Sequence, residues 1–292
     1  MTYIGRFAPS PTGLLHFGSL LAALASYLDA RAHQGRWLLR IEDLDPPREH
    51  PGAREQIPRT LENFGLHWDG TLCYQSDRLH LYQEALDQLI TDQHAYRCGC
   101  SRKQVQQRTG QPVYDSYCLL NPPNSEQDSA WRAAHKQAEI CFDDEIQGPQ
   151  HFPLEESGDF VIKRKDGLFA YQLAVVVDDA AQGITHIVRG SDLLDETPRQ
   201  IHLQDLLGYS EPRYSHIPVA NNAAGQKLSK QNLAQPLDEQ RPVPQIIEAL
   251  RFLGQQPPPE LHDATLPELL QWAEENWHPE QIARQRAIVW EG

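Results

Sequence analysis

The hydrophobic pattern at the start of the chain predicts alternating strands and helices. A short apolar run at 3–8 leads into residues 9–13, where two prolines and a glycine exclude regular structure. Leucines at helical spacing follow at 20–28, and Gly35 is suited to end that helix. Residues 37–41 read as a second buried strand. Strand, loop, helix and strand in this order form a βαβ unit, which predicts a parallel sheet.

The rest of the chain continues this pattern with one interruption. A helix is expected at 54–64, where Pro58 should kink or split it, and another at 79–93. Residues 95–150 hold four of the five cysteines and few apolar periods, so they read as an insertion. Further strands are expected at 160–165, 173–177, 184–188 and 214–220, with helices at 198–207 and from 242 onward, the last one broken by prolines 257–259.

Composition narrows the class of protein. The chain has 292 residues, enough for about two domains, and its 40% hydrophobic content argues against intrinsic disorder. It contains no apolar run of about 18 residues and no signal peptide at 1–11, so we expect a cytoplasmic protein that does not bind a membrane. A net charge of −14 argues against a general nucleic-acid coat protein but leaves room for a local basic surface.

Two separate segments carry residues suited to phosphate chemistry. The turn after the first strand, residues 6–19, contains His16 and Gly18 and opens the first helix. The N-terminus of a helix offers unpaired N–H groups and partial positive charge to a phosphate. Far downstream, Lys227 and Lys230 are separated by two residues in a polar loop, where they can stabilise charge that develops on a triphosphate.

Together these two segments resemble the signatures of the class I aminoacyl-tRNA synthetases. The sequence His16-Phe17-Gly18-Ser19 is similar to their "HIGH" motif, and residues 227–231, KLSKQ, are similar to their "KMSKS" motif. Ser19 and Gln231 depart from the motifs. The resemblance implies a Rossmann-type catalytic domain that uses ATP with Mg²⁺. It implies catalytic roles for His16, Gly18, Lys227 and Lys230, and ATP contacts from Pro9, Thr12, Gly13, His16, Gly18, Ser19, Lys227, Ser229 and Lys230.

The first turn and the segment at 40–45, RIEDLD, are similar to the glutamyl branch of that family. The chemistry agrees, because an arginine suits a carboxylate and an acidic side chain suits an ammonium. Arg6 and Arg189 are the arginine candidates, and Glu42 is the candidate for the ammonium. The resemblance implies a glutamate pocket formed by Arg6, Phe7, Ala8, Pro9, Ser10, Glu42, Tyr171 and Arg189.

The insertion contains a candidate metal site. Cys98 and Cys100 are followed by Tyr114 and Cys118, and three thiolates with a fourth ligand can hold a structural zinc ion. The resembling family uses a tyrosine oxygen as the fourth ligand, which implies Tyr114. On chemistry alone, His94 and His135 are rival ligands. Cys73 and Cys141 lie outside this pattern and are expected to be buried hydrophobic side chains.

The complete prediction is an α/β fold in four parts. A Rossmann-type parallel-sheet catalytic domain occupies 1–95 and 176–235, an inserted zinc-bearing α/β subdomain occupies 96–175, and a small helical segment occupies 236–292. The segment after the lysine loop is too short for a large anticodon-binding domain, so the chain resembles the truncated paralogues of glutamyl-tRNA synthetase. Members of that group activate L-glutamate without tRNA and attach it to queuosine in the anticodon stem-loop of tRNA(Asp). A monomer is expected.

The sequence gives little indication of which residues contact RNA. The candidate basic runs are Arg97, Arg102 and Lys103, then Lys163, Arg164 and Lys165, then Arg132 and Lys136. Three alternatives stay open: a minimal glutamyl-tRNA synthetase that charges the 3′ end, a non-catalytic synthetase-like RNA-binding module, and a small-molecule nucleotidyltransferase.

Overall fold

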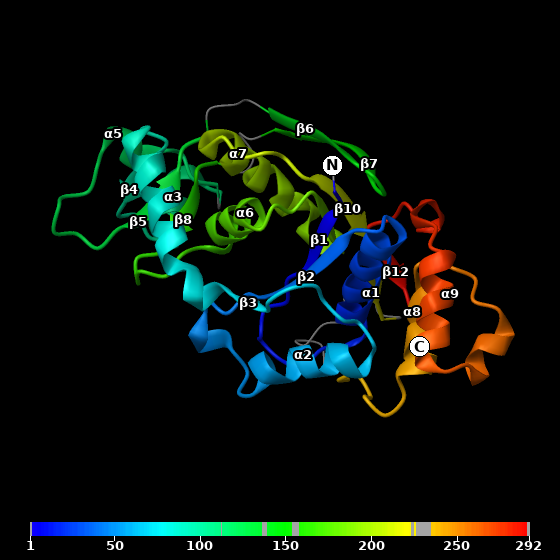
Figure 1. The fold of residues 1–292 in the computed structure, drawn as a ribbon. Coiled ribbons are helices and arrows are strands. Elements are labelled where there is room, and N and C mark those ends of the chain that lie inside the picture. Colours follow the sequence, from blue (N-terminus) through cyan, green and yellow to red (C-terminus); the bar gives the residue numbers. More distant parts are fainter. Residues whose placement is uncertain are drawn as a thin grey trace.

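The structure is a computed structural model that describes residues 2–111, 113–135, 139–153, 158–222, 225 and 235–290. Figure 1 shows a central α/β unit with a smaller unit at one end, around β4, β5 and β8, and a helical unit at the other, around α8 and α9. The helices are α1 (Phe17–Ala32), α2 (Ala53–Asn63), α3 (Leu79–Thr91), α4 (Arg102–Thr109), α5 (Tyr117–Leu120), α6 (Tyr171–Ala181), α7 (Thr197–Leu207), α8 (Pro242–Phe252) and α9 (Leu266–Glu275). The strands are β1 (Ile4–Phe7), β2 (Arg36–Ile41), β3 (Cys73–Tyr74), β4 (Ala95–Cys98), β5 (Ala130–Ala133), β6 (Glu139–Asp144), β7 (Gly148–Pro153), β8 (Phe160–Lys163), β9 (His186–Gly190), β10 (Arg213–Ile217), β11 (Val219–Asn221) and β12 (Ala287–Val289).

The central sheet is parallel, as the βαβ pattern predicts. Strands β1, β2 and β3 pair in that order, and β9 pairs with β10. The two groups meet where β1 lies beside β9, because the N–H of Thr185 donates to the carbonyl of Ile4 at 2.9 Å. The strand order is therefore β3-β2-β1-β9-β10. The chain adds β2 and β3 on one side of β1 and then adds β9 and β10 on the other side, so the topology switches between β1 and β9. In open α/β sheets, ligands bind at such a switch point, beyond the carboxyl ends of the strands.

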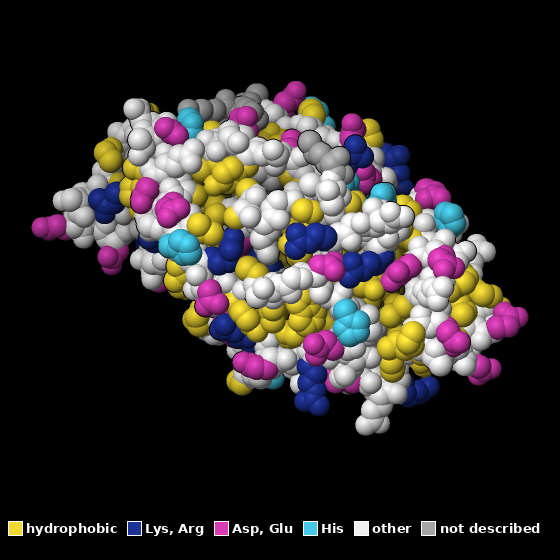
Figure 2. All heavy atoms as spheres, in the orientation of Figure 1, with side chains coloured by type: hydrophobic (Ala, Val, Ile, Leu, Met, Phe, Trp, Pro, Cys, Tyr) yellow, Lys and Arg dark blue, Asp and Glu magenta, His cyan; other side chains and the backbone are white. Residues whose placement is uncertain are grey.

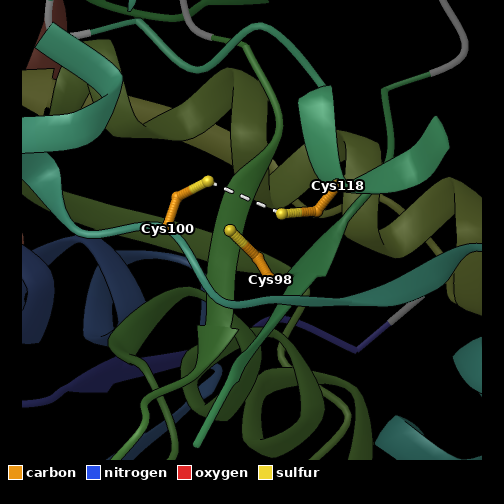
Figure 3. Close-up of side chains that lie close together, drawn as sticks. All are labelled: Cys98, Cys100 and Cys118. Atoms are coloured by element: carbon orange, nitrogen blue, oxygen red, sulfur yellow. Dashed lines mark hydrogen bonds between the residues drawn. The ribbon is translucent and has the colours of Figure 1, made fainter. Parts of the chain in front are cut away.

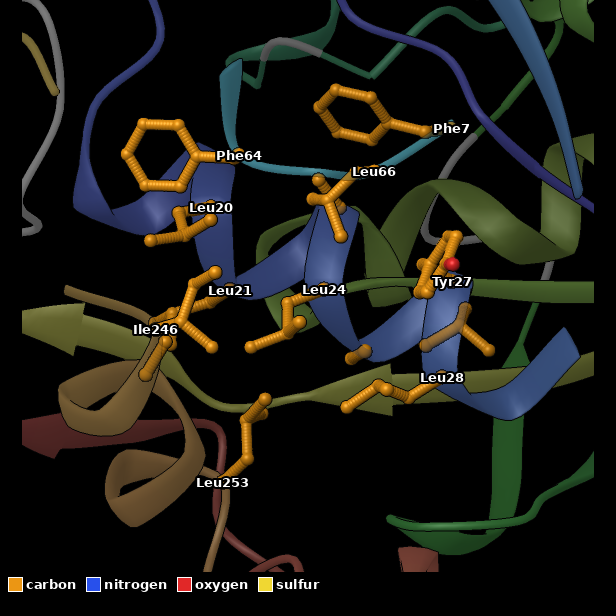
Figure 4. Packing of buried hydrophobic residues seen from close by; sticks show 14 of the residues in the cluster. Phe7, Leu20, Leu21, Leu24, Tyr27, Leu28, Phe64, Leu66, Ile246 and Leu253 are labelled. Atoms are coloured by element: carbon orange, nitrogen blue, oxygen red, sulfur yellow. The ribbon is translucent and has the colours of Figure 1, made fainter. Parts of the chain in front are cut away.

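Helix α1 is the centre of the main hydrophobic core. Its leucines 20, 21, 24 and 28 are almost completely buried, and Figure 4 shows them pointing toward Ile246, Leu253, Phe64 and Leu66. The helix is apolar on most of its circumference because the sheet packs on one side and α8 and α9 pack on the other. This packing fixes the position of the N-terminus of α1 at the switch point.

The segment expected to be an insertion builds two different sheets. Strands β4, β5 and β8 form a small antiparallel sheet, and the cysteine cluster lies at one end of β4. The β6–β7 hairpin instead extends the central sheet, because β6 pairs with β10 at Asp144 and Tyr214. Side chains of this hairpin therefore reach the central unit.

The secondary structure differs from the sequence prediction in two segments. Residues 173–177 were expected to form a strand, but they lie inside helix α6. All five are buried, and a short apolar run that is buried on every side has no period that separates a helix from a strand. The C-terminal segment contains the strand β12, which pairs with β11, in addition to the expected helices.

One proline lies inside a helix without ending it, whereas another separates two strands. Pro58 lies inside α2, which continues to Asn63, so of the expected kink or split the split does not occur. The ring removes one backbone hydrogen bond, while buried Ile57 and Leu61 hold the helix against the core. Pro218 separates β10 from β11, so the strand expected at 214–220 is two shorter strands. Within the described residues, no helix is long and apolar enough to cross a membrane.

Truncation of a leucine at the centre of α1 tests this account of the core. Leu24→Ala is expected to lower the free energy of unfolding by about 2–5 kcal/mol, because it leaves a cavity in a fully buried cluster. Gln271→Ala, on the exposed face of α9, should change it by less than about 0.5 kcal/mol. Chemical denaturation of both variants measures the difference, and equal losses would contradict the packing described.

Candidate active site and metal centre

A cavity of about 510 Å³ opens at the switch point, beyond the carboxyl ends of β1, β2, β9 and β10. It is lined by every residue proposed for the amino-acid pocket, from Arg6 to Ser10 together with Glu42, Tyr171 and Arg189. Thr12, His16, Gly18 and Ser19 of the proposed ATP site line the same cavity, whereas Gly13 is not part of its wall. The fold thus brings together residues that lie up to 183 positions apart in the sequence.

The N-terminus of α1 faces this cavity in a form suited to an anion. His16 occupies the N-cap position without a capping hydrogen bond from its own side chain, and no acidic residue lies in the first turn. The backbone around Gly18 and Ser19 lines the cavity wall. A first turn without a capping side chain keeps its N–H groups and its partial positive charge available to a phosphate.

Beneath the cavity lies a cluster of buried charges. Asp179 of α6 accepts from Arg6 at 3.2 Å and from Arg40 at 2.8 Å, and all three side chains are at least 94% buried. The neighbouring Asp178 binds Arg78 at 2.5 Å and lies 3.7 Å from Arg40. Burial alone would raise the pKa of Asp179, but the two guanidinium groups lower it below its usual range. The carboxylate therefore stays ionised and holds Arg6 against the sheet.

Glu42 is the carboxyl group of the cavity wall that the sequence assigns to the ammonium. It follows β2 directly, and its backbone N–H donates to Pro9 at 3.0 Å, which ties it to the first turn. Its side chain lies 3.5 Å from the guanidinium of Arg40. Burial raises the pKa of Glu42 to about 7, although Arg40 and Arg6 oppose the shift. A buried carboxyl that titrates near neutrality has a strong electrostatic preference for a cation beside it.

Arg189 differs from Arg6 in its partners. Its Nε–H donates to His216 at 3.0 Å, and one Nη2–H donates to the hydroxyl of Thr197 at 2.8 Å. The Nη1 atom lies 3.5 Å from the hydroxyl of Tyr171. No carboxylate among the described residues lies within 4.0 Å of this guanidinium. A guanidinium that faces a cavity without a carboxylate partner is suited to binding one from a ligand.

The lysine motif, with Lys227, Ser229, Lys230 and Gln231, lies outside the described residues. The residues on both sides of it reach the cavity. Before it, Val219 and Ala220 of β11 form part of the cavity wall. After it, Pro236 forms a bridge with His16, and the N–H of Leu237 donates to the carbonyl of Leu15 at 3.0 Å. The described residues before the motif thus line the cavity, and those after it contact the first turn.

The predicted metal ligands lie together in the small antiparallel unit (Figure 3). The sulfur atoms of Cys98, Cys100 and Cys118 are within 4.8 Å of one another, with 3.5 Å between Cys100 and Cys118. A tetrahedral zinc ion with bonds of about 2.3 Å would separate two sulfurs by about 3.8 Å. The hydroxyl of Tyr114 lies 3.3 Å from the sulfur of Cys98. This donor set could hold a zinc ion.

The alternative metal ligands and the two remaining cysteines lie outside this cluster. Neither His94 nor His135 belongs to the group of three sulfurs, and His135 instead contacts Asp159 at 2.6 Å. The expectation that Cys73 and Cys141 are buried hydrophobic side chains is wrong, because Cys73 is half-buried and Cys141 is exposed. Cys141 lies on the β6–β7 hairpin, where alternate side chains face solvent.

The three basic runs proposed for RNA are not equivalent. Arg102 and Lys103 are exposed at the start of α4. Arg132 packs over the ring of Tyr114 and donates to the carbonyl of Asp159, while Arg164 is paired with Asp45 and Asp166. Lys136 lies outside the described residues. Figure 2 shows Lys and Arg at several separate places on one face, among Asp and Glu, without one continuous basic patch.

Several wall residues were not singled out from the sequence. Asp192, Leu193 and Pro218 line the cavity, as do the backbone segments at the ends of β9 and β10. Their signal in the sequence is only their position directly after strand-like runs. A second cavity of about 390 Å³ adjoins the first and shares Ser10, Thr12, Glu42 and Tyr171 with it.

The comparisons with known proteins agree with this geometry. A family model described as tRNA synthetases class I (E and Q), catalytic domain, matches residues 4–262. The chain belongs to this family. It is therefore a ligase with the α/β fold of the class I synthetases, a class that uses ATP with Mg²⁺.

Curated relatives of this class I synthetase match nearly its whole length. A glutamyl-Q tRNA(Asp) synthetase of Ectopseudomonas mendocina is 53% identical over 98% of this chain and 97% of its own. The protein of that name from Aromatoleum aromaticum is 52% identical over 97% of this chain and 91% of its own. Among solved structures, a glutamate-tRNA synthetase from Elizabethkingia anophelis has a TM-score of 0.83 and 23% identity, covering 100% of this chain and 68% of its own. At that identity the likeness concerns the fold alone.

The raised pKa of Glu42 predicts a pH dependence for amino-acid binding in this synthetase. An ammonium favours the ionised carboxylate, so binding should be strong above about pH 7 and should weaken as the pH falls through that value. The KM for the amino acid, measured by pyrophosphate exchange from pH 6 to 8.5, is expected to rise at the acidic end. Glu42→Gln should raise the KM at every pH and remove this dependence. A wild-type KM that does not vary with pH would contradict the role of Glu42.

Proposed function

We propose that this class I synthetase activates L-glutamate with ATP, without tRNA, and transfers it to the queuosine base at the wobble position of tRNA(Asp). The observation that carries the glutamate part is the charge pattern of the cavity wall. Arg189 lacks a carboxylate partner among the described residues, and Glu42, beside Arg40, lines the cavity with a pKa that burial raises. An amino acid with a second carboxylate supplies both charges.

Each end of glutamate has a partner in this proposal. The ammonium binds Glu42, one carboxylate binds Arg189 with help from the hydroxyl of Tyr171, and Arg6, held by its ion pair with Asp179, contributes hydrogen-bond donors. Phe7, Ala8, Pro9 and Ser10 line the same cavity and complete the wall of the pocket in this proposal. Binding both ends fixes the α-carboxylate for attack on the α-phosphorus of ATP, with pyrophosphate leaving.

ATP enters as its magnesium complex at the N-terminus of α1. The first-turn N–H groups and the side chain of His16 stabilise the phosphates, and the backbone at Gly18 permits close approach of the nucleotide. Lys227, Ser229 and Lys230 act from the downstream segment; Val219 and Ala220 before it line the cavity, and Pro236 after it bridges to His16. The charge of the two lysines stabilises the pentacoordinate phosphorus as pyrophosphate departs.

The second cavity provides room for the acceptor. It shares Ser10, Thr12, Glu42 and Tyr171 with the first cavity, so a nucleoside there would reach the activated carboxyl group. Arg48 and Arg164 on its rim are suited to RNA phosphates. The printed names of the curated relatives support glutamyl-queuosine tRNA(Asp) as the product. We further propose the division into 1–95, 96–175, 176–235 and 236–292, and action as a monomer.

The choice of acceptor is tested with tRNA(Asp) that carries or lacks queuosine. With glutamate and ATP, only the queuosine-containing tRNA is expected to gain a glutamyl group, and mass spectrometry of nuclease digests should find it on the wobble nucleoside. Glutamate-dependent pyrophosphate exchange should proceed with no tRNA present. Glutamylation of the 3′-terminal adenosine would instead identify a minimal glutamyl-tRNA synthetase, and an absence of exchange would identify a non-catalytic RNA-binding module.

We propose that Cys98, Cys100, Tyr114 and Cys118 hold one structural zinc ion. Elemental analysis of the purified protein should find one zinc per chain. Cys98→Ser should lower the zinc content and the melting temperature, because a closed zinc sphere stabilises the small unit around it. Cys73→Ser, which removes a thiol outside the cluster, should change neither. Tyr114→Phe isolates the fourth ligand, and full zinc occupancy in that variant would exclude the phenol oxygen.

A further inference from the structure

Behind Arg189 lies a pair of buried residues that the proposed reaction does not use. His216 is in the fourth position of β10, and its side chain is completely buried. Its Nδ1 lies 2.6 Å from an oxygen of Asp144, and its Nε2 lies 3.0 Å from Nε of Arg189. Asp144 is the last residue of β6, so the β6–β7 hairpin reaches the amino-acid pocket through this contact.

The neighbours of the imidazole determine where its proton lies. The Nε–H of an arginine can only donate, so Nε2 of His216 must accept. An ionised carboxylate can only accept, so Nδ1 must carry the hydrogen. Burial lowers the pKa of His216 to about 4, and Asp144 keeps a pKa below its usual range despite its burial, mainly through its bond to that ring. The pair is therefore a neutral imidazole, protonated on Nδ1, beside a carboxylate.

Asp144 is itself held rigidly. One of its oxygens accepts the backbone N–H groups of Ile146, Gln147 and His216 at 2.7–3.1 Å, which leaves the other oxygen for the imidazole. The carboxylate thus accepts hydrogen bonds from both the backbone and the ring of His216. The acceptor that it presents to Arg189 is fixed in position and in tautomer.

These contacts also decide which edge of the guanidinium is available. His216 takes the Nε–H and Thr197 takes one Nη2–H, and neither of these two acceptor residues lines the cavity. The Nη1 atom lies beside the hydroxyl of Tyr171, a residue that does line it. An arginine whose inner donors are occupied cannot rotate without breaking buried hydrogen bonds.

We propose that Asp144 and His216 are positioning residues for glutamate recognition: Asp144 holds the Nδ1–H tautomer of His216, whose Nε2 fixes the guanidinium of Arg189 for the substrate carboxylate. This inference rests on the proposed function, because it assigns the substrate contact to Arg189. It adds a specificity determinant from the hairpin, a segment that lines neither of the two cavities described here.

Asp144→Asn is the sharpest test because it keeps the shape. The amide oxygen can retain the three backbone bonds, but the NH₂ then faces Nδ1 and forces the proton onto Nε2, opposite the Nε–H of Arg189. The KM for glutamate in pyrophosphate exchange is expected to rise roughly 10- to 100-fold, while the KM for ATP stays within about twofold. An unchanged KM for glutamate in a folded Asp144→Asn variant overturns the proposal.

A conservative pair at His216 separates positioning from mere packing. His216→Gln retains an acceptor oxygen near the position of Nε2, and its KM for glutamate should lie much closer to the wild type than that of His216→Leu. Equal losses in the two variants would contradict the proposal. Ser215→Ala is the matched control, because Ser215 precedes His216 on β10, faces the other side and binds Glu145 at 2.9 Å.

A spectroscopic readout does not depend on any variant being active. In the ¹⁵N spectrum of wild-type protein labelled at histidine, the His216 ring should show a protonated Nδ1 and an unprotonated Nε2, assigned by its loss in His216→Gln. A protonated Nε2 overturns the inference even if Asp144→Asn fails to fold. Failure of the wild type to exchange pyrophosphate with glutamate would instead count against the proposed function and leave the tautomer result intact.

Discussion

Two buried arginines, Arg6 and Arg40, share the carboxylate of Asp179, and the floor of the cavity is built on this contact. Arg6 comes from β1, Arg40 from β2 and Asp179 from α6, so the cluster joins two neighbouring strands to a helix. Burying any one of these charges alone would cost several kcal/mol, whereas the paired arrangement compensates each of them. The cluster therefore requires all three elements to be in place, and they are the elements that carry Glu42 and Tyr171.

This constraint explains why 173–177 belongs to a helix despite its β-branched residues. In a strand, Asp178 and Asp179 would point to opposite faces of the sheet. In α6 they lie about a quarter turn apart, and Arg40 reaches both, at 3.7 and 2.8 Å. The same helix places Tyr171 at its first residue, on the wall of the cavity. Tertiary ion pairing thus overrides a local preference that favours a strand.

The sequence predicts the parts of the fold that have a clear period or a strict turn. The βαβ unit at 3–41, the helices at 79–93 and 198–207, and the grouping of Cys98, Cys100 and Cys118 follow from spacing and residue type. The contribution of Asp144 does not follow, because it stands in the run Asp143-Asp144-Glu145, which has the composition of a solvated surface segment. Burial of its carboxylate depends on the pairing of β6 with β10, a contact between residues far apart in the chain.

The two arginines on the cavity wall make different contributions because their partners differ. Arg6 is already neutralised by Asp179, so it supplies hydrogen-bond donors with little net charge. Arg189 is held by an uncharged imidazole and an uncharged hydroxyl, so its full positive charge is directed into the cavity. Opposite it, Glu42 is desolvated by burial and favours a cation. A cavity wall that combines such a cation with a carboxyl near its titration point favours a ligand that carries both signs of charge. A net charge of −14 does not exclude an acidic ligand, because the field that the ligand meets in the cavity comes mainly from nearby charges, while salt screens the more distant ones.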